Sequence, residues 1–375
     1  MSQIIDASIL THFASLEDPR DIRGKEHLLL DIITIALCAV ISGAEGWEDM
    51  AEYGRAKQDW LSTFLALPSG IPCADTFGRV FARLDPEQMQ CCFINWVKAI
   101  SELLEAEVVG IDGKTLRYSG DKGCGKAAIH MVSAWASANR LVLGQRKVDD
   151  KSNEITAIPA LLKVLEIAGC IVTIDAMGCQ KEIASTIIEG GADYVLALKR
   201  NQGGLLEDVQ WLFQQAQESK FEDVTHSFAQ SIDKGHGRIE IRRCWTLSQL
   251  DYLIQKPLWQ GLQTVVLVQS ERRYNGQMTT ENRFFISSLP SQAALLMNAV
   301  RTHWSIENSL HWVLDVSFHE DACRIHRDSA PQNMALLRHL ALNLLGKDSS
   351  SKRGIAARRK KAAWDQTYLI KLLTQ

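Results

Sequence analysis

Apolar residues recur at helical spacing through residues 1–103 of the chain. In the segment CADTFGRVFARLD they fall at i, i+3, i+4 and i+7, which places them on one face of a helix. This stripe consists of Phe77, Val80, Phe81 and Leu84. Asp75 or Thr76 is a suitable N-cap, and the preceding LPSG interrupts the pattern. The pattern predicts an all-helical N-terminal domain over residues 1–103.

From residue 104 the pattern changes to short apolar runs, bounded by turn residues. The expected strands are EVVGIDGKTL, KAAIHMVSAWAS, RLVLGQRKVD, CIVTIDA and DYVLALK, with helices AIPALLKVLEIAG and CQKEIASTIIEGG before the last two strands. CIVTIDA and DYVLALK are almost wholly apolar, which is typical of strands buried on both faces. Three strands followed by alternating helices and strands predict an α/β domain over residues 104–346.

A strand-rich stretch at about 220–290 interrupts this order and predicts a β-rich insertion. Within it, TVVLVQSERRYNGQMTTENRFFISSL predicts a hairpin that turns at Asn275-Gly276. A long helix containing HWSIENSLHWVLDVSF follows, then a helix over PQNMALLRHLALNLLG. Residues 347–375 form a basic C-terminal tail.

Composition and charge indicate the cellular compartment of the protein but do not define its function. The net charge is −3, so any affinity for nucleic acid has to arise from local clusters of basic residues. Nine cysteines without a C-x-x-C pair, and a start that lacks a secretory signal, predict reduced thiols in a cytoplasmic protein. The longest apolar stretch, residues 28–44, contains Asp31 and is short for a membrane span, so we expect a buried helix and no membrane partner.

Three acidic residues stand out by position. Asp112 and Asp175 each end a predicted apolar strand, and Glu307 lies in the long helix after the insertion. An acid at the end of a buried strand is costly unless it is paired or binds a cation. Each acid also has an ordinary interpretation: Asp112-Gly113 as a tight turn, Asp175 as a helix N-cap, and Glu307 as a solvated helix residue.

Together the three acids predict a metal site. Clustered carboxylates repel each other, and a divalent cation relieves that repulsion. Mg²⁺ prefers hard oxygen ligands, and two such ions can activate a water or a 3′-hydroxyl at a phosphodiester. We therefore expect Mg²⁺ or Mn²⁺, as two ions, on Asp112, Asp175 and Glu307.

A phosphate-loop pattern in the chain is misleading. Residues 120–127, GDKGCGKA, fit G-x-x-x-x-G-K, but Ala127 stands where that motif needs a Ser or Thr for Mg²⁺. The residues that follow predict a strand, whereas the motif opens a helix. Both departures argue against an NTPase.

Five blocks of the sequence resemble, in order, those of the H-repeat-associated insertion-sequence transposases: GIDGKTLR, TIDAMGCQKEIA, DYVLALKRNQ, KGHGRIEIRRCW and HWSIENSLHWVLDVSFHED. The N-terminal segments DPRDIRGKEHLLLDIITIALCAVISGAEGWEDMAEYG and CADTFGRVFARLD also match, so the resemblance covers nearly the whole chain. These proteins belong to the DDE group, whose catalytic domain is ribonuclease-H-like. The resemblance implies that fold, and a metal-binding triad of Asp112, Asp175 and Glu307.

The chain departs from the group at one point. Many related transposases carry Tyr, Arg and Lys at set spacings around the catalytic Glu, where this chain has Val300, His303 and Leu314. Arg301, His303 and His311 are candidates to supply those polar contacts instead. Glu320 and Asp321 are reserve candidates for the third acid.

Contacts to DNA are predicted from local charge, with solvated surface as the open alternative. Residues 347–361 hold seven basic residues against one acid, and Arg79 and Arg83 lie outside the apolar stripe of a helix that could read DNA. Trp304 and Trp312 could stack on an unpaired base, or belong to the core. The candidate contacts are Arg79, Arg83, Lys199, Arg200, Arg238, Arg242, Arg301, His303, His311, Arg358, Arg359, Lys360 and Lys361.

The resemblance implies a DNA transposase that cleaves at insertion-sequence ends and transfers strands into target DNA. Double-stranded DNA is the expected partner, a homodimer is expected when two ends are synapsed, and the expected location is the cytoplasm, at the nucleoid. Two alternatives stay open: a degenerate or repurposed copy that binds DNA without catalysis, and a ribonuclease-H-like nuclease that does not transfer strands.

Overall fold

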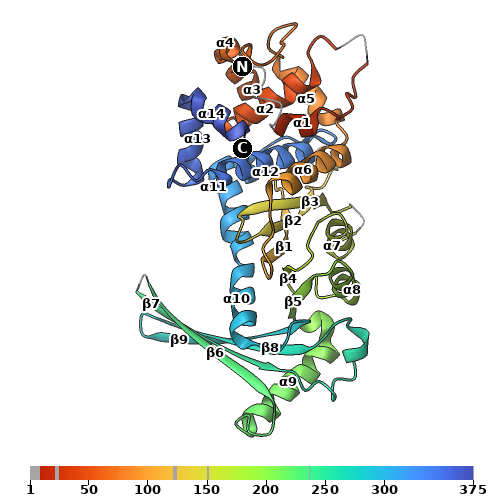
Figure 1. The fold of residues 1–375 in the computed structure, drawn as a ribbon, viewed down its shortest axis with the longest axis vertical. Coiled ribbons are helices and arrows are strands. Elements are labelled where there is room, and N and C mark those ends of the chain that lie inside the picture. The colour runs from red at the N-terminus through yellow and green to blue at the C-terminus, as the bar shows by residue number, and fades with distance from the viewer. Residues whose placement is uncertain (1–8, 22–24, 121–124, 150–151, 236, 375) are drawn as a thin grey trace.

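A computed structural model describes residues 9–21, 25–120, 125–149, 152–235 and 237–374. The molecule is elongated (Figure 1). Helices from both ends of the chain form one end of it, a sheet flanked by helices forms the middle, and long strands extend that sheet at the other end.

Nine strands form a mixed sheet in the order β3-β2-β1-β4-β5-β9-β8-β7-β6. They are β1 (Val108–Thr115), β2 (His130–Ala136), β3 (Leu141–Lys147), β4 (Ile171–Ile174), β5 (Asp193–Leu198), β6 (His226–Gly235), β7 (Arg238–Leu247), β8 (Thr264–Tyr274) and β9 (Gln277–Ser287). β1, β4 and β5 run parallel, while β2, β3 and β9 pair in antiparallel fashion. The predicted order is confirmed: α7 (Glu154–Leu162) precedes β4, and α8 (Lys181–Glu189) precedes β5.

Helices cover both faces of the central sheet. Successive side chains of a strand point to opposite faces. Accordingly, Val109 packs in the core that includes α7 and α8, whereas Val108 packs against α10 (Ala293–His303). β4 is buried at every position, which explains why its sequence, IVTI, shows no alternation of polar and apolar residues.

The regular elements among the described residues up to Ile100 are all helices, in agreement with the predicted helical pattern. Its helices are α1 (Ile9–Phe13), α2 (Leu29–Ser42), α3 (Trp47–Ala56), α4 (Gln58–Leu61), α5 (Ala74–Arg83) and α6 (Pro86–Ile100). The four residues of the predicted stripe on α5 are fully buried. The predicted cap is wrong, because Cys73 is the N-cap and Asp75 lies in the first turn, where its charge still favours the helix dipole.

The C-terminal helices pack against the N-terminal ones. α12 (Ala330–Lys347) contacts α2, α5 and α6, and Asn333 donates hydrogen bonds to the carbonyls of Phe81 and Leu84. Residues 347–374, expected as a basic tail, continue into α13 (Ile355–Trp364) and α14 (Gln366–Leu373). Because these helices share one hydrophobic core with residues 9–100, the predicted domain boundaries at 103 and 346 stay a prediction.

The insertion is built on α9 (Gly203–Glu218) and the strands β6 to β9. The predicted hairpin is confirmed: Tyr274 pairs with Gln277, and the turn residues Asn275 and Gly276 both have positive φ, at 48° and 75°. β9 then pairs with β5, so the insertion extends the central sheet.

The phosphate-loop pattern and the possibility of a membrane span can both be compared with the structure. Lys126, which ends the phosphate-loop pattern, is followed by strand β2 and not by a helix; residues 121–124 of that pattern lie outside the described residues. No individual helix in the described ranges has the length and apolar character to cross a membrane, although α2 and α3, bent by 96°, pass that test as a pair by length and composition.

Candidate active site

Asp112 lies inside β1 and not at its end. Both the prediction that Asp112 ends its strand and the alternative of a tight turn at Asp112-Gly113 are wrong, because β1 continues in register to Thr115. Glycine at position 113 has a steric role instead. A Cβ atom there would lie 2.1 Å from Oε1 of Glu154 and 2.4 Å from Nε2 of His130, two side chains that form an ion pair with each other.

The register of β1 and β4 places Asp175 beside Asp112. Ile111 pairs with Ile174 on the two parallel strands, so the next residue on each side is one of the aspartates. Neighbouring strands lie about 4.8 Å apart. The tertiary structure therefore brings these two acids together, and both line the same cavity.

Asp175 does not cap the following helix, since the N-cap of α8 is Gln180. Its Oδ1 accepts hydrogen bonds from the backbone N–H groups of Met177 at 3.0 Å and Gly178 at 3.4 Å. These bonds form an Asx-type turn that fixes the carboxylate just beyond β4. The helix-cap interpretation of Asp175 is thereby excluded.

Glu307 lies where the predicted long helix is interrupted. α10 ends at His303, a π-helix spans Ile306–His311, and α11 (Trp312–Phe318) follows. π-Helical turns are rare and frequently occur at functional sites. Glu307 is exposed in the second position of this turn.

The three predicted acids line one cavity of about 320 Å³. Asp112 comes from β1, Asp175 follows β4, and Glu307 comes from the π-helix. The π-helix packs closely over β1, since a Cβ atom at Gly110 would lie 3.4 Å from Cβ of Ile306. The interpretation of Glu307 as an isolated solvated residue does not account for this placement.

Burial and nearby negative charge both shift the pKa of Asp112. Its pKa is raised to about 7, mainly by burial and further by the charges of Asp175, Glu154 and Glu307, although the N–H of Gly113 donates to Oδ1 at 2.9 Å. A nearby cation favours the ionised form of such a carboxyl. The chemistry of the donors, which are hard carboxylate oxygens, fits Mg²⁺ or Mn²⁺.

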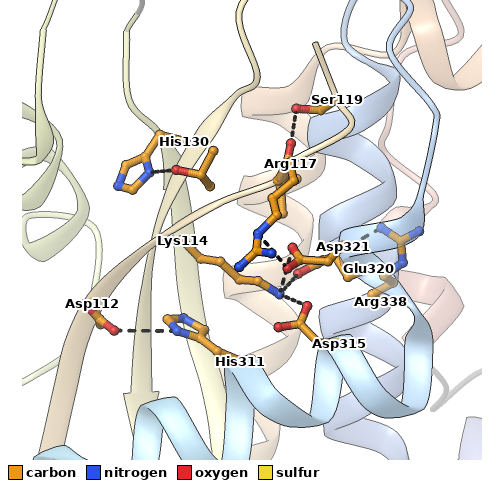
Figure 2. A network of polar contacts seen from close by, with 12 residues as sticks. Asp112, Lys114, Arg117, Ser119, His130, His311, Asp315, Glu320, Asp321 and Arg338 are labelled. Atoms are coloured by element: carbon orange, nitrogen blue, oxygen red, sulfur yellow. Dashed lines mark hydrogen bonds and ion pairs between the residues drawn. The ribbon is translucent and has the colours of Figure 1, made fainter.

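The side chains do not converge on a common point. Among the residues that the structure describes, no three His, Cys, Asp or Glu side chains form a group that could hold a metal ion. Asp112 is directed toward His311, with 3.5 Å between Oδ2 and Nδ1 (Figure 2). The donor chemistry therefore fits a divalent cation, while the predicted number of ions stays a prediction.

The reserve acids Glu320 and Asp321 belong to a different cluster (Figure 2). Nζ of Lys114 lies 2.9 Å from Glu320 and 3.9 Å from Asp321. Arg338 also contacts Glu320, at 3.7 Å, and Arg117 contacts Asp321, at 3.1 Å. Neither acid lines the cavity that holds Asp112, Asp175 and Glu307.

The two histidines near the acids are uncharged at neutral pH. Burial lowers the pKa of His303, whose Nδ1 lies 3.0 Å from the hydroxyl of Thr173, and His303 lines the cavity. Burial, together with the charge of Lys114, lowers the pKa of His311 to about 4. Both pKa values are thus lowered by burial, and the DNA contacts predicted for His303 and His311 stay predictions. The other two positions at which this chain differs from related transposases are Val300, which lines the cavity, and Leu314, which is buried.

A groove of about 510 Å³ adjoins the acidic cavity, between α10 and the extended sheet. The two hollows share Glu281, Arg283, Val300 and Trp304. Two predicted DNA contacts, Arg242 and Arg301, line the groove. Arg272 and Arg283 line it as well; neither is among the contacts predicted from the sequence, because nothing in the local pattern shows that β8 and β9 face α10.

Acids partly neutralise this groove. Arg242 and Arg301 both contact Asp233, at 2.6 Å and 3.2 Å. Arg272 and Arg238 both contact Glu240, at 3.1 Å, and Arg238 itself does not line the groove. Each of these four arginines thus has a carboxylate partner.

Other candidates lie near the acids. Lys199 lines the acidic cavity, and Arg200 is exposed next to it. Trp304 and Trp312 are 44% and 59% exposed, so neither is a core residue, and the guanidinium of Arg283 lies 5.2 Å from the ring of Trp304. This arrangement leaves an aromatic face beside the acids.

The predicted contacts on α5 and α13 lie elsewhere. Arg79 and Arg83 are exposed on α5, and Arg79 lines a separate hollow of about 640 Å³ together with Arg324 and Arg327. On α13, Lys360 and Lys361 are exposed, and Nζ of Lys361 lies 4.0 Å from the ring of Tyr368.

The two arginines of α13 bind backbone carbonyls. Arg359 is 6% exposed, lies 4.2 Å from the ring of Phe318, and donates to the carbonyls of Val40 and Ser317. Arg358 donates to the carbonyls of Leu345 and Asp348, among others. The interpretation of Arg359 as a DNA contact is therefore corrected, because its guanidinium is buried and occupied.

Comparison with known proteins agrees with this architecture. Residues 104–344 match the family model described as transposase DDE domain, and residues 10–97 match the model described as DDE_Tnp_1-associated. The H repeat-associated putative transposase YhhI of Escherichia coli K12 is 40% identical over 372 residues, with 97% of each chain covered. The putative transposase YncI of Escherichia coli O157:H7 is 39% identical, covering 98% of this chain and 94% of its own.

The chain belongs to the DDE transposase family, and its sequence places it with the H-repeat-associated transposases of that family. Among solved structures, a synaptic complex of the piggyBac transposase with hairpin DNA aligns with 99% of this chain and 77% of its own, at a TM-score of 0.42 and 12% identity. A similarity this weak does not establish a shared fold.

Proposed function

We propose that this chain is a metal-dependent DNA transposase that cleaves DNA at the ends of an insertion sequence and transfers the cut strands into target DNA. The observation that carries the proposal is the meeting of Asp112, Asp175 and Glu307 at one cavity, from three separate elements. Membership of the DDE transposase family supports it.

The strand arrangement supports a ribonuclease-H-like catalytic domain. Strands β3, β2, β1, β4 and β5 are consecutive in the sheet, with β2 antiparallel to β1 and both β4 and β5 parallel to it. Parallel neighbours place Asp112 and Asp175 at the same level. α10 then crosses the sheet from the insertion and leads into the π-helix with Glu307.

Asp112, Asp175 and Glu307 would hold the divalent cations, which we propose to be two Mg²⁺ or Mn²⁺ ions. When bound, such ions supply an activated water or 3′-hydroxyl and stabilise the leaving oxygen of a phosphodiester. The carboxylates would orient the ions, and Nδ1 of buried His311 lies 3.5 Å from Oδ2 of Asp112. Lys199 lies at the cavity, where its ammonium can contact a phosphate.

We propose that DNA enters along the groove between α10 and the extended sheet. This groove opens into the acidic cavity through the shared residues Arg283 and Trp304. Arg242, Arg272 and Arg301 would contact phosphates there. Double-stranded DNA is the proposed partner, a homodimer the proposed assembly for synapsing two ends, and the nucleoid in the cytoplasm the proposed location.

A strand-transfer assay tests the proposal. The purified chain is incubated with short duplexes that end in the terminal repeats flanking its own gene, together with a supercoiled target plasmid, in Mg²⁺, Mn²⁺ or EDTA. The proposal predicts metal-dependent nicking at the repeat boundary, followed by joined products on sequencing gels. Asp112→Asn and Asp175→Asn should abolish both steps.

The assay also separates the two alternatives. Cleavage without joined products would indicate a nuclease that does not transfer strands. Specific binding to the repeats in EDTA, with no cleavage in either metal, would indicate a copy that has kept DNA binding alone. Cleavage that survives both substitutions would overturn the assignment of the acids.

A further inference from the structure

Lys114 lies on the same face of β1 as Asp112. The two residues are two positions apart on the strand, and side chains at that spacing point the same way. Lys114 is largely covered, at 12% side-chain exposure. Its ammonium contacts Asp315 of α11 and Glu320 of the 3₁₀ turn Glu320–Ala322.

The charges around Lys114 balance within one cluster, the Lys114 cluster, shown in Figure 2. Its cations are Lys114, Arg117 and Arg338, and its carboxylates are Asp315, Glu320 and Asp321. The side chains of Glu320 and Arg338 are 2% and 3% exposed. No charge of this cluster is left over for a metal ion or a phosphate, so the cluster needs another explanation.

The Lys114 cluster connects β1, which carries Asp112, to the helical segment that carries Glu307. Glu307, His311 and Asp315 follow one another at intervals of four along the π-helix and α11. Residues at this spacing lie on one side of a helix. His311 contacts Asp112, and Asp315 contacts Lys114. This side of the helix therefore packs along the face of β1 that carries Asp112 and Lys114.

We propose that Lys114 is a positioning residue: its ion pairs with Asp315 and Glu320 hold the helix that carries Glu307 against the strand that carries Asp112, and thereby set the separation of these two carboxylates. The proposal rests on the proposed function for its consequence in metal binding. Removing the ammonium takes away the attraction that ties Asp315 and Glu320 to β1, and of these two carboxylates only Glu320 keeps a cationic partner, Arg338.

The test compares Lys114→Met with Lys114→Arg and with Asp348→Asn. The last variant is the matched control, because Asp348 is a buried carboxylate paired with Lys371 at 3.2 Å and bonded to the hydroxyl of Tyr368, at the α12–α14 end of the chain. Urea unfolding ranks the three variants by stability. Hydrogen exchange of residues 306–318 and Mn²⁺ affinity, measured by electron paramagnetic resonance, are the specific readouts.

We expect Lys114→Met to speed exchange across residues 306–318 and to weaken Mn²⁺ binding at least about tenfold, as for other residues that orient metal ligands. Lys114→Arg should restore most of both properties. Asp348→Asn should leave both nearly unchanged at a comparable loss of stability. Equal effects of Lys114→Met and Asp348→Asn, or no effect of Lys114→Met on exchange, would overturn the proposal.

Failure of the proposed function is recognised separately. If Mn²⁺ does not bind the wild-type chain, or binds equally well to Asp112→Asn, the metal site is wrong. Hydrogen exchange of residues 306–318 needs no metal and still decides whether Lys114 holds the helix to the strand.

Discussion

Asp112 and Asp175 occupy equivalent positions on two neighbouring parallel strands, each one residue beyond the paired Ile111 and Ile174. This register sets two carboxylates side by side, and Glu307 faces the same cavity. Such an arrangement opposes folding, because like charges repel and burial disfavours ionised groups. Unfavourable groupings of this kind are expected where function requires them.

Replacing either aspartate should lower the rate of DNA cleavage without lowering the stability of the fold. We expect Asp112→Asn and Asp175→Asn each to lower DNA cleavage at least about a hundredfold, since even residues that orient metal ligands contribute up to that factor. Neither change should lower the free energy of unfolding, because each removes a repulsive charge. Rates of plasmid nicking and urea titrations measure both. Asp251→Asn, 88% exposed at its side chain, is the control that should change neither.

A side chain at position 113 should displace the side chains of Glu154 and His130. In Gly113→Ala the added methyl group meets Glu154 and His130 well inside contact distance, so their ion pair must open. We expect a loss of about 1 kcal/mol in the free energy of unfolding, at the low end for overpacked sites, because only the ends of two flexible side chains have to move. Gly235→Ala on β6, where nothing lies within 4 Å of the added carbon, serves as the control. Equal stability of the two variants in urea would contradict the steric role of Gly113.

The groove between α10 and the sheet can be tested by salt dependence. Each phosphate contact contributes close to one unit to the slope of log affinity against log salt. We expect Arg272→Ala, which removes a groove arginine, to reduce that slope by about 1. Arg273→Ala, the next residue on β8 and not a groove residue, should leave the slope unchanged. Fluorescence anisotropy with labelled duplex at several salt concentrations measures both; identical slopes would argue against this DNA path.

Arg359 should act in folding and not in DNA binding. Arg359→Met leaves the carbonyls of Val40 and Ser317 without their charged donor, so we expect a loss of about 2–3 kcal/mol in stability. DNA affinity, measured below the melting transition, should not change. The neighbouring residue provides the comparison, because Lys360 is exposed and Lys360→Met should leave stability intact. A DNA affinity lowered only by the Arg359 variant would restore it as a contact.

Asp348 should make stability depend on pH. Burial by itself raises the pKa of Asp348, but hydrogen bonds from Ser350, Tyr368 and Lys371 outweigh it and hold this pKa below its usual value. A lowered pKa in the folded state stabilises the fold above the unfolded pKa of about 3.9, and this contribution is lost as the pH falls further. We expect Asp348→Asn to cost about 2 kcal/mol at pH 7 and progressively less below about pH 4. Urea unfolding between pH 7 and pH 3 tests this; a constant difference would contradict it.

Sequence periodicity was sufficient where an element depends on its own residues. The buried stripe of α5, the uniformly apolar β4 and the Asn275-Gly276 hairpin were predicted because helix faces, two-sided burial and tight turns leave local patterns. The turn predicted at Asp112-Gly113 failed for the complementary reason. The need for glycine there comes from Glu154 and His130, which only the folded chain places over the strand.

The sequence by itself determined the family, the order of β1 to β5 with α7 and α8 between them, and three acids as candidate metal ligands. Only the tertiary structure decided that these acids share a cavity, that Glu320 and Asp321 belong to the Lys114 cluster, and that Arg359 is buried. The physical reason is the separation along the chain of the residues that come into contact. Periodicity records which side of an element is buried, whereas strand register and helix docking join residues more than two hundred positions apart, as Lys114 and Glu320 are.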